Sequence, residues 1–228
     1  MTSSSLVCRS FVIVGVVLLA GVGRADPPAA TTPLKVEDRL MNERFSRARP
    51  PGTVVDVVML HFSSDVIAHP DDPYRVDRVV ATYEGGPASA HYLIDREGKV
   101  YRLVKEERAA FHGGKGKLPW LADRENKLNA TSIGIEMMAI GSKADMKIFM
   151  SGEKYDAYAK RHPENIGFTD KQYASLRALM AEIYARHPEV KADRRHVVGH
   201  ADYAAGRRTD PGELFGWDKI DLPKEAGK

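Results

Sequence analysis

Cysteine is almost missing from this 228-residue sequence, in which Cys8 is the only one. It precedes an apolar run at 11–22, so it is badly placed for lipid attachment and would leave with a cleaved leader. The remaining chain then has no disulfide, no thiolate metal ligand and no cysteine nucleophile. An exported protein of this kind needs no oxidation step in an oxidising compartment.

Clustered charge and long apolar stretches are also scarce. The formal net charge is only +3, which argues against nucleic-acid binding because that depends on concentrated basic charge. The apolar run at 11–22 is shorter than the roughly 20 residues of a membrane-spanning helix. With Arg9 before it and Gly23-Arg24-Ala25 after it, the run is typical of a secretory signal. We therefore expect 1–25 to be a signal peptide and the protein to be periplasmic or extracellular, without stable membrane insertion.

The rest of the chain has the composition of one globular domain, with 43% hydrophobic and 29% charged residues. Residues 26–52 contain five of the 13 prolines and no apolar periodicity, which predicts an extended lead-in. We expect the folded domain to span 53–222 and to be followed by a loose tail at 223–228.

Secondary structure follows from the spacing of apolar residues. Apolar or alternating runs predict strands, and an apolar stripe between capping signals predicts a helix. The strands are expected at 54–60, 90–95, 100–104, 132–138 and 194–199, the helices at 73–83 and 169–187, and a polar surface insertion at 140–168. This mixture predicts a single α/β domain with a central mixed sheet flanked by helices and a cleft at the strand ends.

Four residues of this pattern carry chemistry. His61 follows the first strand, His200 ends the last strand, and Asp210 stands just before Pro211. Two imidazoles and one carboxylate are a donor set for catalytic zinc that leaves one position open, although a lone His61 after a strand would more often be structural. Glu136 lies in an apolar strand, where a carboxylate is costly, and is therefore a functional candidate.

Several segments together resemble the type-2 N-acetylmuramoyl-L-alanine amidases, zinc enzymes of peptidoglycan breakdown whose fold is shared by animal peptidoglycan recognition proteins. The matching segments occur in the family's order at 57–61, 89–98, 111–114, 129–136 and 199–217. The resemblance implies one zinc ion per chain, held by His61, His200 and Asp210. It also implies that Glu136 carries the proton during hydrolysis of the amide between N-acetylmuramic acid and L-alanine.

Five further positions are drawn in by the resemblance. Arg208 stands where bacterial members commonly have a lysine; a guanidinium can stabilise an oxyanion but will not donate a proton. His91 and His112 match recurrent histidines near the family's groove, and a purely structural role is equally open for both. Trp120 and Asn129 complete the expected substrate-binding set, although Trp120 is also typical of a packed anchor.

Two other residues are decoys. Along a strand, His196 would lie roughly 13 Å from His200 at about 3.3 Å per residue, which favours a structural role. Some relatives use a tyrosine near the zinc, but Ala90 occupies that position here and Tyr92 falls on the next aromatic core position. The sequence therefore resembles the glutamate-using branch.

Two rival interpretations remain open. A non-catalytic peptidoglycan-binding module is disfavoured because the ligand set and the glutamate are complete. Another zinc hydrolase of the cell wall is less favoured because the His-Glu-x-x-His motif of the common zinc peptidases is absent. We expect a monomer whose partner is peptidoglycan or its soluble muropeptides.

Overall fold

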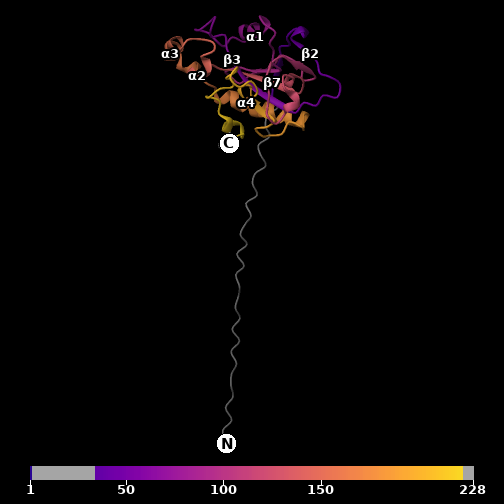
Figure 1. The fold of residues 1–228 in the computed structure, drawn as a ribbon. Helices are drawn as coiled ribbons and strands as arrows, with labels where there is room; N and C mark the ends of the chain where they lie inside the picture. The colour runs from indigo at the N-terminus through magenta and orange to yellow at the C-terminus, as the bar shows by residue number, and fades with distance from the viewer. Residues whose placement is uncertain (2–33, 223–228) are drawn as a thin grey trace. The chain divides into compact units, whose positions relative to one another are not determined.

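The computed structural model describes residues 34–222 and, besides these, only Met1 (Figure 1). Apart from Met1, the expected signal peptide at 1–25 lies outside the described residues, as does the expected tail at 223–228. Within the part of the chain that is described, no helix combines the length and apolar character needed to cross a bilayer.

A six-stranded sheet forms the centre of the domain, and a two-stranded sheet lies apart from it. The central order is β1 (Val36–Asp38), β5 (Val100–Arg102), β4 (Tyr92–Ile94), β7 (Ser132–Met138), β3 (Val57–Ser63) and β8 (Val197–Gly199). Strands β4 and β5 pair antiparallel, whereas the other neighbours pair parallel, which confirms the predicted mixed sheet. The second sheet pairs β2 (Ser46–Ala48) with β6 (Arg108–Ala110).

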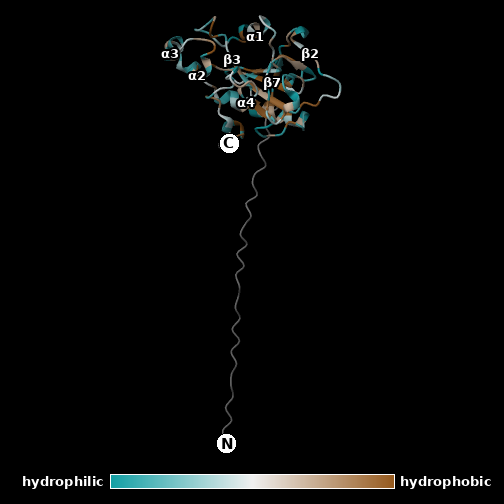
Figure 2. Ribbon diagram, viewed as in Figure 1, coloured by the Kyte–Doolittle hydropathy of each residue, from teal (hydrophilic) through white to brown (hydrophobic). Residues whose placement is uncertain are grey.

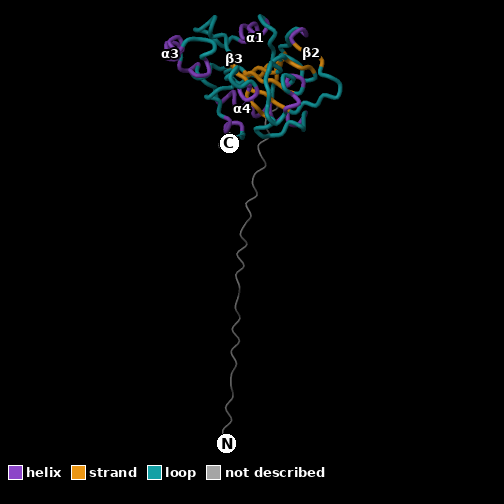
Figure 3. The backbone as a smooth tube through the Cα atoms, in the orientation of Figure 1, coloured by secondary structure: helices purple, strands orange, loops and turns teal. Residues whose placement is uncertain are grey.

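Helices cover both faces of the central sheet, as Figures 1 and 3 show for α1 and α4. The helices are α1 (Val76–Glu84), α2 (Lys143–Met146), α3 (Gly152–Arg161), α4 (Asp170–Arg186) and α5 (His200–Tyr203). Short 3-10 turns occupy Glu43–Phe45, Ala122–Arg124, Leu128–Ala130, Pro163–Asn165 and Trp217–Ile220. Helix α4 begins at the predicted capping box, in which the Gln172 N–H donates to Thr169 Oγ1 and the Thr169 N–H donates to Gln172 Oε1.

The central strands β3 and β7 present different residues to their two faces because side chains alternate along a strand. Val58 and Leu60 of β3 pack in one cluster with the apolar stripe of α4, where Figure 2 shows hydrophobic residues gathered. Val57 and Met59 turn to the opposite face and pack near α5. His61 and Glu136 follow this second pattern, so the fold directs both side chains away from the α4 core.

Three expectations differ from the structure. Strands β1 and β2 both fall inside the expected lead-in at 26–52, so the folded domain starts earlier than residue 53. Helices α2 and α3 occupy the expected polar insertion at 140–168. These elements are short or largely exposed, and an exposed element needs no apolar periodicity. The strand expected at 54–60 lies three residues later, so His61 lies within β3 rather than after it.

Candidate active site

Three neighbouring strands bring the chemical groups together. His61 of β3 pairs in register with Glu136 of β7, and β8 on the other side of β3 leads directly into α5, whose first residue is His200. Asp210 comes from the loop after α5. Its Oδ2 lies 2.7 Å from His61 Nδ1 and 3.1 Å from His200 Nδ1. The three potential ligand atoms all lie within 4.8 Å of one another.

The Nε2 atoms of His200 and His61, which point away from Asp210, each have a hydrogen-bond partner in the chain. His200 Nε2 lies 2.9 Å from the Gly113 carbonyl, which can only accept, so this nitrogen carries the proton. His61 Nε2 lies 3.2 Å from His112 Nδ1, and His112 Nε2 lies 3.1 Å from Ser132 Oγ. The Ser132 hydroxyl donates to the Leu128 carbonyl at 2.7 Å, so it accepts from His112. His112 Nδ1 must then accept from His61, which leaves His61 Nδ1 unprotonated.

This arrangement fits a metal cation. In the tautomers just derived, two imidazole lone pairs and a carboxylate oxygen converge, and a bound cation relieves their repulsion without breaking a hydrogen bond at either Nε2. Burial lowers the pKa of His61, which favours the neutral ligand form. Two neutral imidazoles and one carboxylate are a common donor set for catalytic zinc.

Glu136 has the opposite electrostatic character. Its side chain is buried, and burial together with the charge of Asp210 raises its pKa well above the ordinary value. Its Oε2 atom has no hydrogen-bond partner among the described residues. An unpartnered buried carboxylate oxygen is costly in a purely structural role, so this atom is suited to exchange a proton with a reacting molecule.

Two hydroxyl groups stand next to Glu136. Ser63 lies two residues after His61 and therefore on the same face of β3. Tyr83 reaches down from α1, and its hydroxyl donates to Ser63 Oγ at 2.6 Å. A hydrogen bond from the Ser63 hydroxyl and the positive charge of Arg208 partly counteract the rise in the pKa of Glu136. The sequence pattern predicted Tyr83 in the apolar stripe of its helix, and its ring does lie in that cluster. The pattern of apolar residues cannot predict that the Tyr83 hydroxyl reaches the pocket.

A pocket of about 300 Å³ surrounds these groups. Its polar lining includes all three ligand candidates, Glu136, Ser63 and Tyr83, and Arg208 stands exposed at the same pocket. Its apolar walls include Val66, Ile67, Phe111, Met146 and Phe149. The pocket therefore combines three potential metal ligands, a buried carboxylate with a free oxygen and a permanent cation beside an apolar surface.

The structure places the four expected substrate-binding residues differently. Only His112 lines the pocket, where it supports His61. His91 is completely buried, accepts from the Gly134 N–H at 3.0 Å and donates to the Arg108 carbonyl; burial lowers its pKa to about 3. His91 therefore holds the backbone of β7 through a hydrogen bond and lies outside the pocket lining.

Trp120 and Asn129 also lie outside the pocket lining. The Trp120 indole donates to the Arg195 carbonyl at 3.0 Å, although the residue is exposed. Asn129 Oδ1 accepts from the Gly113 N–H at 2.8 Å and so positions the carbonyl that holds His200. Substrate contact by these two residues stays a prediction.

Gly134 makes room for His112, the residue that supports His61. A Cβ atom on Gly134 would lie 2.5 Å from Cγ of His112, which is too close for any side chain. The missing side chain lets the His112 ring lie flat against β7, between Ser132 and His61. Gly134 was part of the segment that matched the family, but its contact partner is set by the tertiary fold.

Comparisons with known proteins agree with this geometry. The family model "N-acetylmuramoyl-L-alanine amidase" matches residues 51–213. The 1,6-anhydro-N-acetylmuramyl-L-alanine amidase AmpD of Haemophilus influenzae is 30% identical over 131 residues, which cover 58% of this chain and 55% of AmpD. The N-acetylmuramoyl-L-alanine amidase AmiD of Escherichia coli is 30% identical over 173 residues, which cover 73% of this chain and 52% of AmiD. The chain thus spans about half the length of the curated relatives it matches.

A solved structure is also similar. It is the complex of AmiD from E. coli with the substrate anhydro-N-acetylmuramic acid-L-Ala-D-gamma-Glu-L-Lys. The superposition has a TM-score of 0.54 at 28% sequence identity and covers 77% of this chain and 60% of the AmiD chain.

Proposed function

Because the chain belongs to the N-acetylmuramoyl-L-alanine amidase family, we propose that it is a zinc-dependent amidase. It hydrolyses the amide between the lactyl group of N-acetylmuramic acid and the L-alanine of the peptidoglycan stem peptide. The observation that carries this proposal is the convergence of His61, His200 and Asp210 beside the unpartnered oxygen of Glu136.

The three ligand residues would hold one zinc ion. Bound there, zinc supplies Lewis-acid polarisation of the scissile carbonyl and makes water more acidic. The chain supplies the orientation: the Gly113 carbonyl fixes the His200 ring, and His112 with Ser132 fixes the His61 ring. Supporting hydrogen bonds of this kind set the tautomer and basicity of metal ligands.

Glu136 moves the proton. Its Oε2 atom takes a proton from the attacking water as the water oxygen bonds to the carbonyl carbon. It returns that proton to the departing nitrogen as the carbon–nitrogen bond breaks, which leaves the lactyl carboxylic acid and the amine of L-alanine. The carboxylic acid then passes its remaining proton to this amine or to solvent, which gives the lactyl carboxylate. The raised pKa of Glu136 suits a group that must hold the proton between these steps. Arg208 offers positive charge to the carbonyl oxygen as negative charge develops on it.

Product analysis tests this function. Purified zinc-loaded protein is incubated with a defined muropeptide, and the products are identified by mass spectrometry. We expect a free muramic acid derivative and a peptide that begins with L-alanine. A cut within the peptide or at an acetyl group would identify another cell-wall hydrolase. Zinc and muropeptide binding without any cut would identify a recognition module.

We also propose that the protein is exported. In its working location it would be a monomer that acts on peptidoglycan or muropeptides. Export is supported by the signal-peptide pattern of the sequence: a positive charge at Arg9, an apolar run at 11–22 and a small residue at Ala25. N-terminal sequencing of protein from a non-cytoplasmic fraction should find a start near Asp26, and an intact Met1 there would contradict export. Sedimentation measurements test the monomer.

A further inference from the structure

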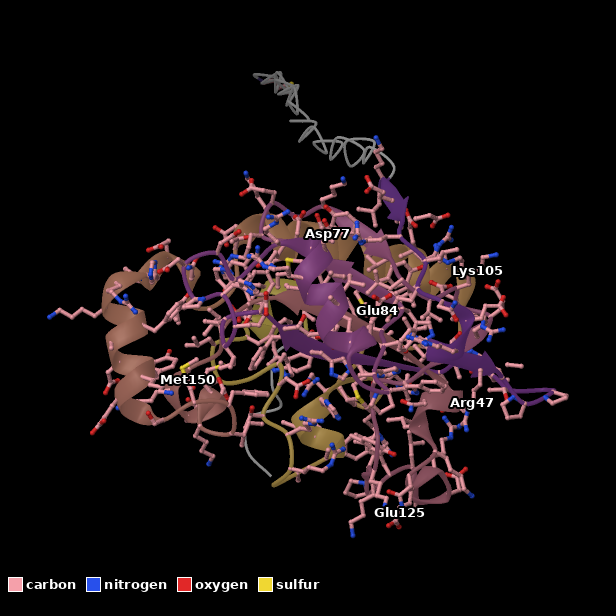
Figure 4. The ribbon with its side chains drawn as sticks, turned by 90° about the horizontal axis from the view of Figure 1, so that it is seen from above. Arg47, Asp77, Glu84, Lys105, Glu125 and Met150 are labelled. Atoms are coloured by element: carbon pink, nitrogen blue, oxygen red, sulfur yellow. The ribbon has the colours of Figure 1, made fainter. Side chains whose placement is uncertain are left out.

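A second hollow continues the catalytic pocket along helix α3. Val66, Ile67 and Phe149 line both cavities, so the two hollows adjoin across these three residues. The second cavity has a volume of about 280 Å³. Figure 4 shows Met150, another of its lining residues, beside α3. A ligand held at the metal ligands can therefore extend over this shared wall toward α3.

The shared wall is unusually apolar for an accessible surface. Ile67 is 61% exposed and Phe149 is 47% exposed, although both are large hydrophobic residues. Exposed apolar groups beside a reaction centre are typical of surfaces that a ligand covers. The wall offers contact area to the aliphatic part of such a ligand.

Helix α3 turns one face toward the second hollow. Lys154, Ala157, Tyr158 and Arg161 line the cavity and follow the spacing of neighbours on one helical face. Tyr158 is buried and accepts a hydrogen bond from Asn165, which anchors the helix. The small side chain of Ala157 leaves open space between the two cations.

Lys154 and Arg161 are the only charged residues in the lining of this cavity. Both are exposed, and no ion pair within residues 34–222 includes either of them. No carboxylate lines the hollow, in contrast to the catalytic pocket with Glu136 and Asp210. The hollow is therefore complementary to an anionic group at the far end of an extended, partly aliphatic ligand.

We propose that this hollow, lined by Lys154 and Arg161, is a subsite for the carboxylates of the stem peptide beyond L-alanine. A γ-linked glutamate keeps its α-carboxylate free, and the last residue of the peptide adds a terminal carboxylate. Both lie on the leaving-group side of the scissile amide. The inference rests on the proposed function, because that reaction places a stem peptide in the catalytic pocket.

Binding of the product peptide tests the subsite without requiring turnover. The probe is L-Ala-γ-D-Glu-L-Lys, compared with the same peptide in which both free carboxylates are carboxamides. Calorimetric titration of the zinc-loaded protein should show weaker binding of the Lys154→Gln/Arg161→Gln variant to the charged peptide by about tenfold, or about 1.4 kcal/mol. The diamide should bind the variant and the unmodified protein equally, because it offers no charge to lose.

A matched variant separates this subsite from net charge. Lys147→Gln/Lys160→Gln removes two exposed cations from the same region, neither of which lines the hollow. We expect this control to bind the charged peptide within about twofold of the unmodified protein. Equal weakening in both double variants, equal weakening for both peptides, or no weakening at all would overturn the subsite. Failure to cleave muropeptides while the charge-dependent binding persists would instead overturn the amidase function and leave the subsite standing.

Discussion

Two glutamates show how this fold treats the same side chain in opposite ways. Glu106 is partly buried, with its side chain 12% exposed, and both oxygens are fully engaged: Oε1 accepts from Tyr92 and Arg186, and Oε2 from Arg186 and His187. Burial opposes ionisation there, but these partners outweigh it and lower the pKa to about 2. Glu136 is 9% exposed with one unpartnered oxygen, and its pKa is raised.

The difference teaches that the supply of partners, together with the depth of burial, separates a stabilising carboxylate from a reactive one. The cavity beside Glu106 shares no lining residue with the catalytic pocket, so the two clusters are separate sites. Removing Glu106 should cost stability and spare the chemistry. Replacing Glu136 should leave stability near its original value and cost turnover, because the native environment of Glu136 already disfavours the charge.

The largest expected loss of turnover follows replacement of a metal ligand, because Glu136 acts on water beside the metal. His200→Ala should abolish zinc retention and reduce muropeptide turnover by at least about a thousandfold, because two remaining ligands do not hold catalytic zinc. Metal analysis of the purified variant and a turnover assay measure both. His196→Ala is the control, since that imidazole contacts Asp193 three residues earlier in the chain. Stoichiometric zinc in the His200 variant would show that the ligand assignment is wrong.

Replacing the reactive glutamate tests one side of the comparison directly. Glu136→Gln keeps the size of the side chain but cannot accept a proton from water. We expect turnover to fall by at least about a hundredfold, within the range of general acid–base groups, while zinc content and melting temperature stay near their original values. More than about a tenth of the original activity, with normal zinc and normal melting, would remove Glu136 from the mechanism.

The strands and helix that carry the core were readable from the sequence. Strand β7 and helix α4 were predicted at almost their observed bounds because their apolar patterns are long and face a buried layer. Strand β1 was missed because it has only three residues at the sheet edge, without an apolar pattern. Helix α3 was missed because only Tyr155 and Tyr158 are buried along its ten residues.

In the candidate site, too, the sequence identified individual residues but not the contacts that depend on the tertiary fold. Residue type and position were enough to single out His61, His200, Asp210 and Glu136, which the structure brings together. The hydrogen bond from Tyr83 to Ser63 depends on how α1 settles on the sheet, and no local pattern encodes that approach. His91 and His112 look alike in sequence and both are buried, yet only the fold shows that His112 lines the pocket and His91 does not.

Replacing the stabilising glutamate tests the other side of the comparison. Because the folded pKa of Glu106 lies near 2 and the ordinary value is 4.5, the ionised form stabilises the fold above about pH 4.5 and loses this effect as the pH falls toward 2. We expect Glu106→Gln to lower the free energy of unfolding at neutral pH by about 3 kcal/mol or less. Urea unfolding from pH 7 to pH 3 should show the gap to the unmodified protein narrowing.

The matched control for this change is Glu107→Gln, which alters an exposed neighbour. It should change the free energy of unfolding by less than about 0.5 kcal/mol. Turnover per folded molecule should stay unchanged in the Glu106 variant. A stability gap that persists undiminished at pH 3 would show that Glu106 stabilises the fold by packing rather than by its charge.

The smallest expected effect concerns the Tyr83 hydroxyl, which orients the Ser63 hydroxyl beside Glu136. Tyr83→Phe removes the group that donates to Ser63 Oγ at 2.6 Å but keeps the ring in its apolar cluster. Loss of this support should leave Glu136 less well oriented, so we expect kcat to fall by about threefold to tenfold with KM unchanged. Tyr101→Phe is the matched control, because that tyrosine is equally buried and donates to Asp95 outside the pocket.

A second background decides whether the Tyr83 hydroxyl acts through the glutamate. In the Glu136→Gln protein the proton carrier is already gone, so adding Tyr83→Phe should change the residual kcat by less than about twofold. A purely structural tyrosine would instead lower kcat by the same factor in both backgrounds, because misfolding or misplacement of the pocket does not depend on what stands at position 136. Equal factors in the two backgrounds, or an equal loss in the Tyr101→Phe control, would therefore show that Glu136 receives no specific help from α1. Strong non-additivity would show instead that the pocket gives its reactive carboxylate a single oriented partner on one oxygen and keeps the other free for the proton.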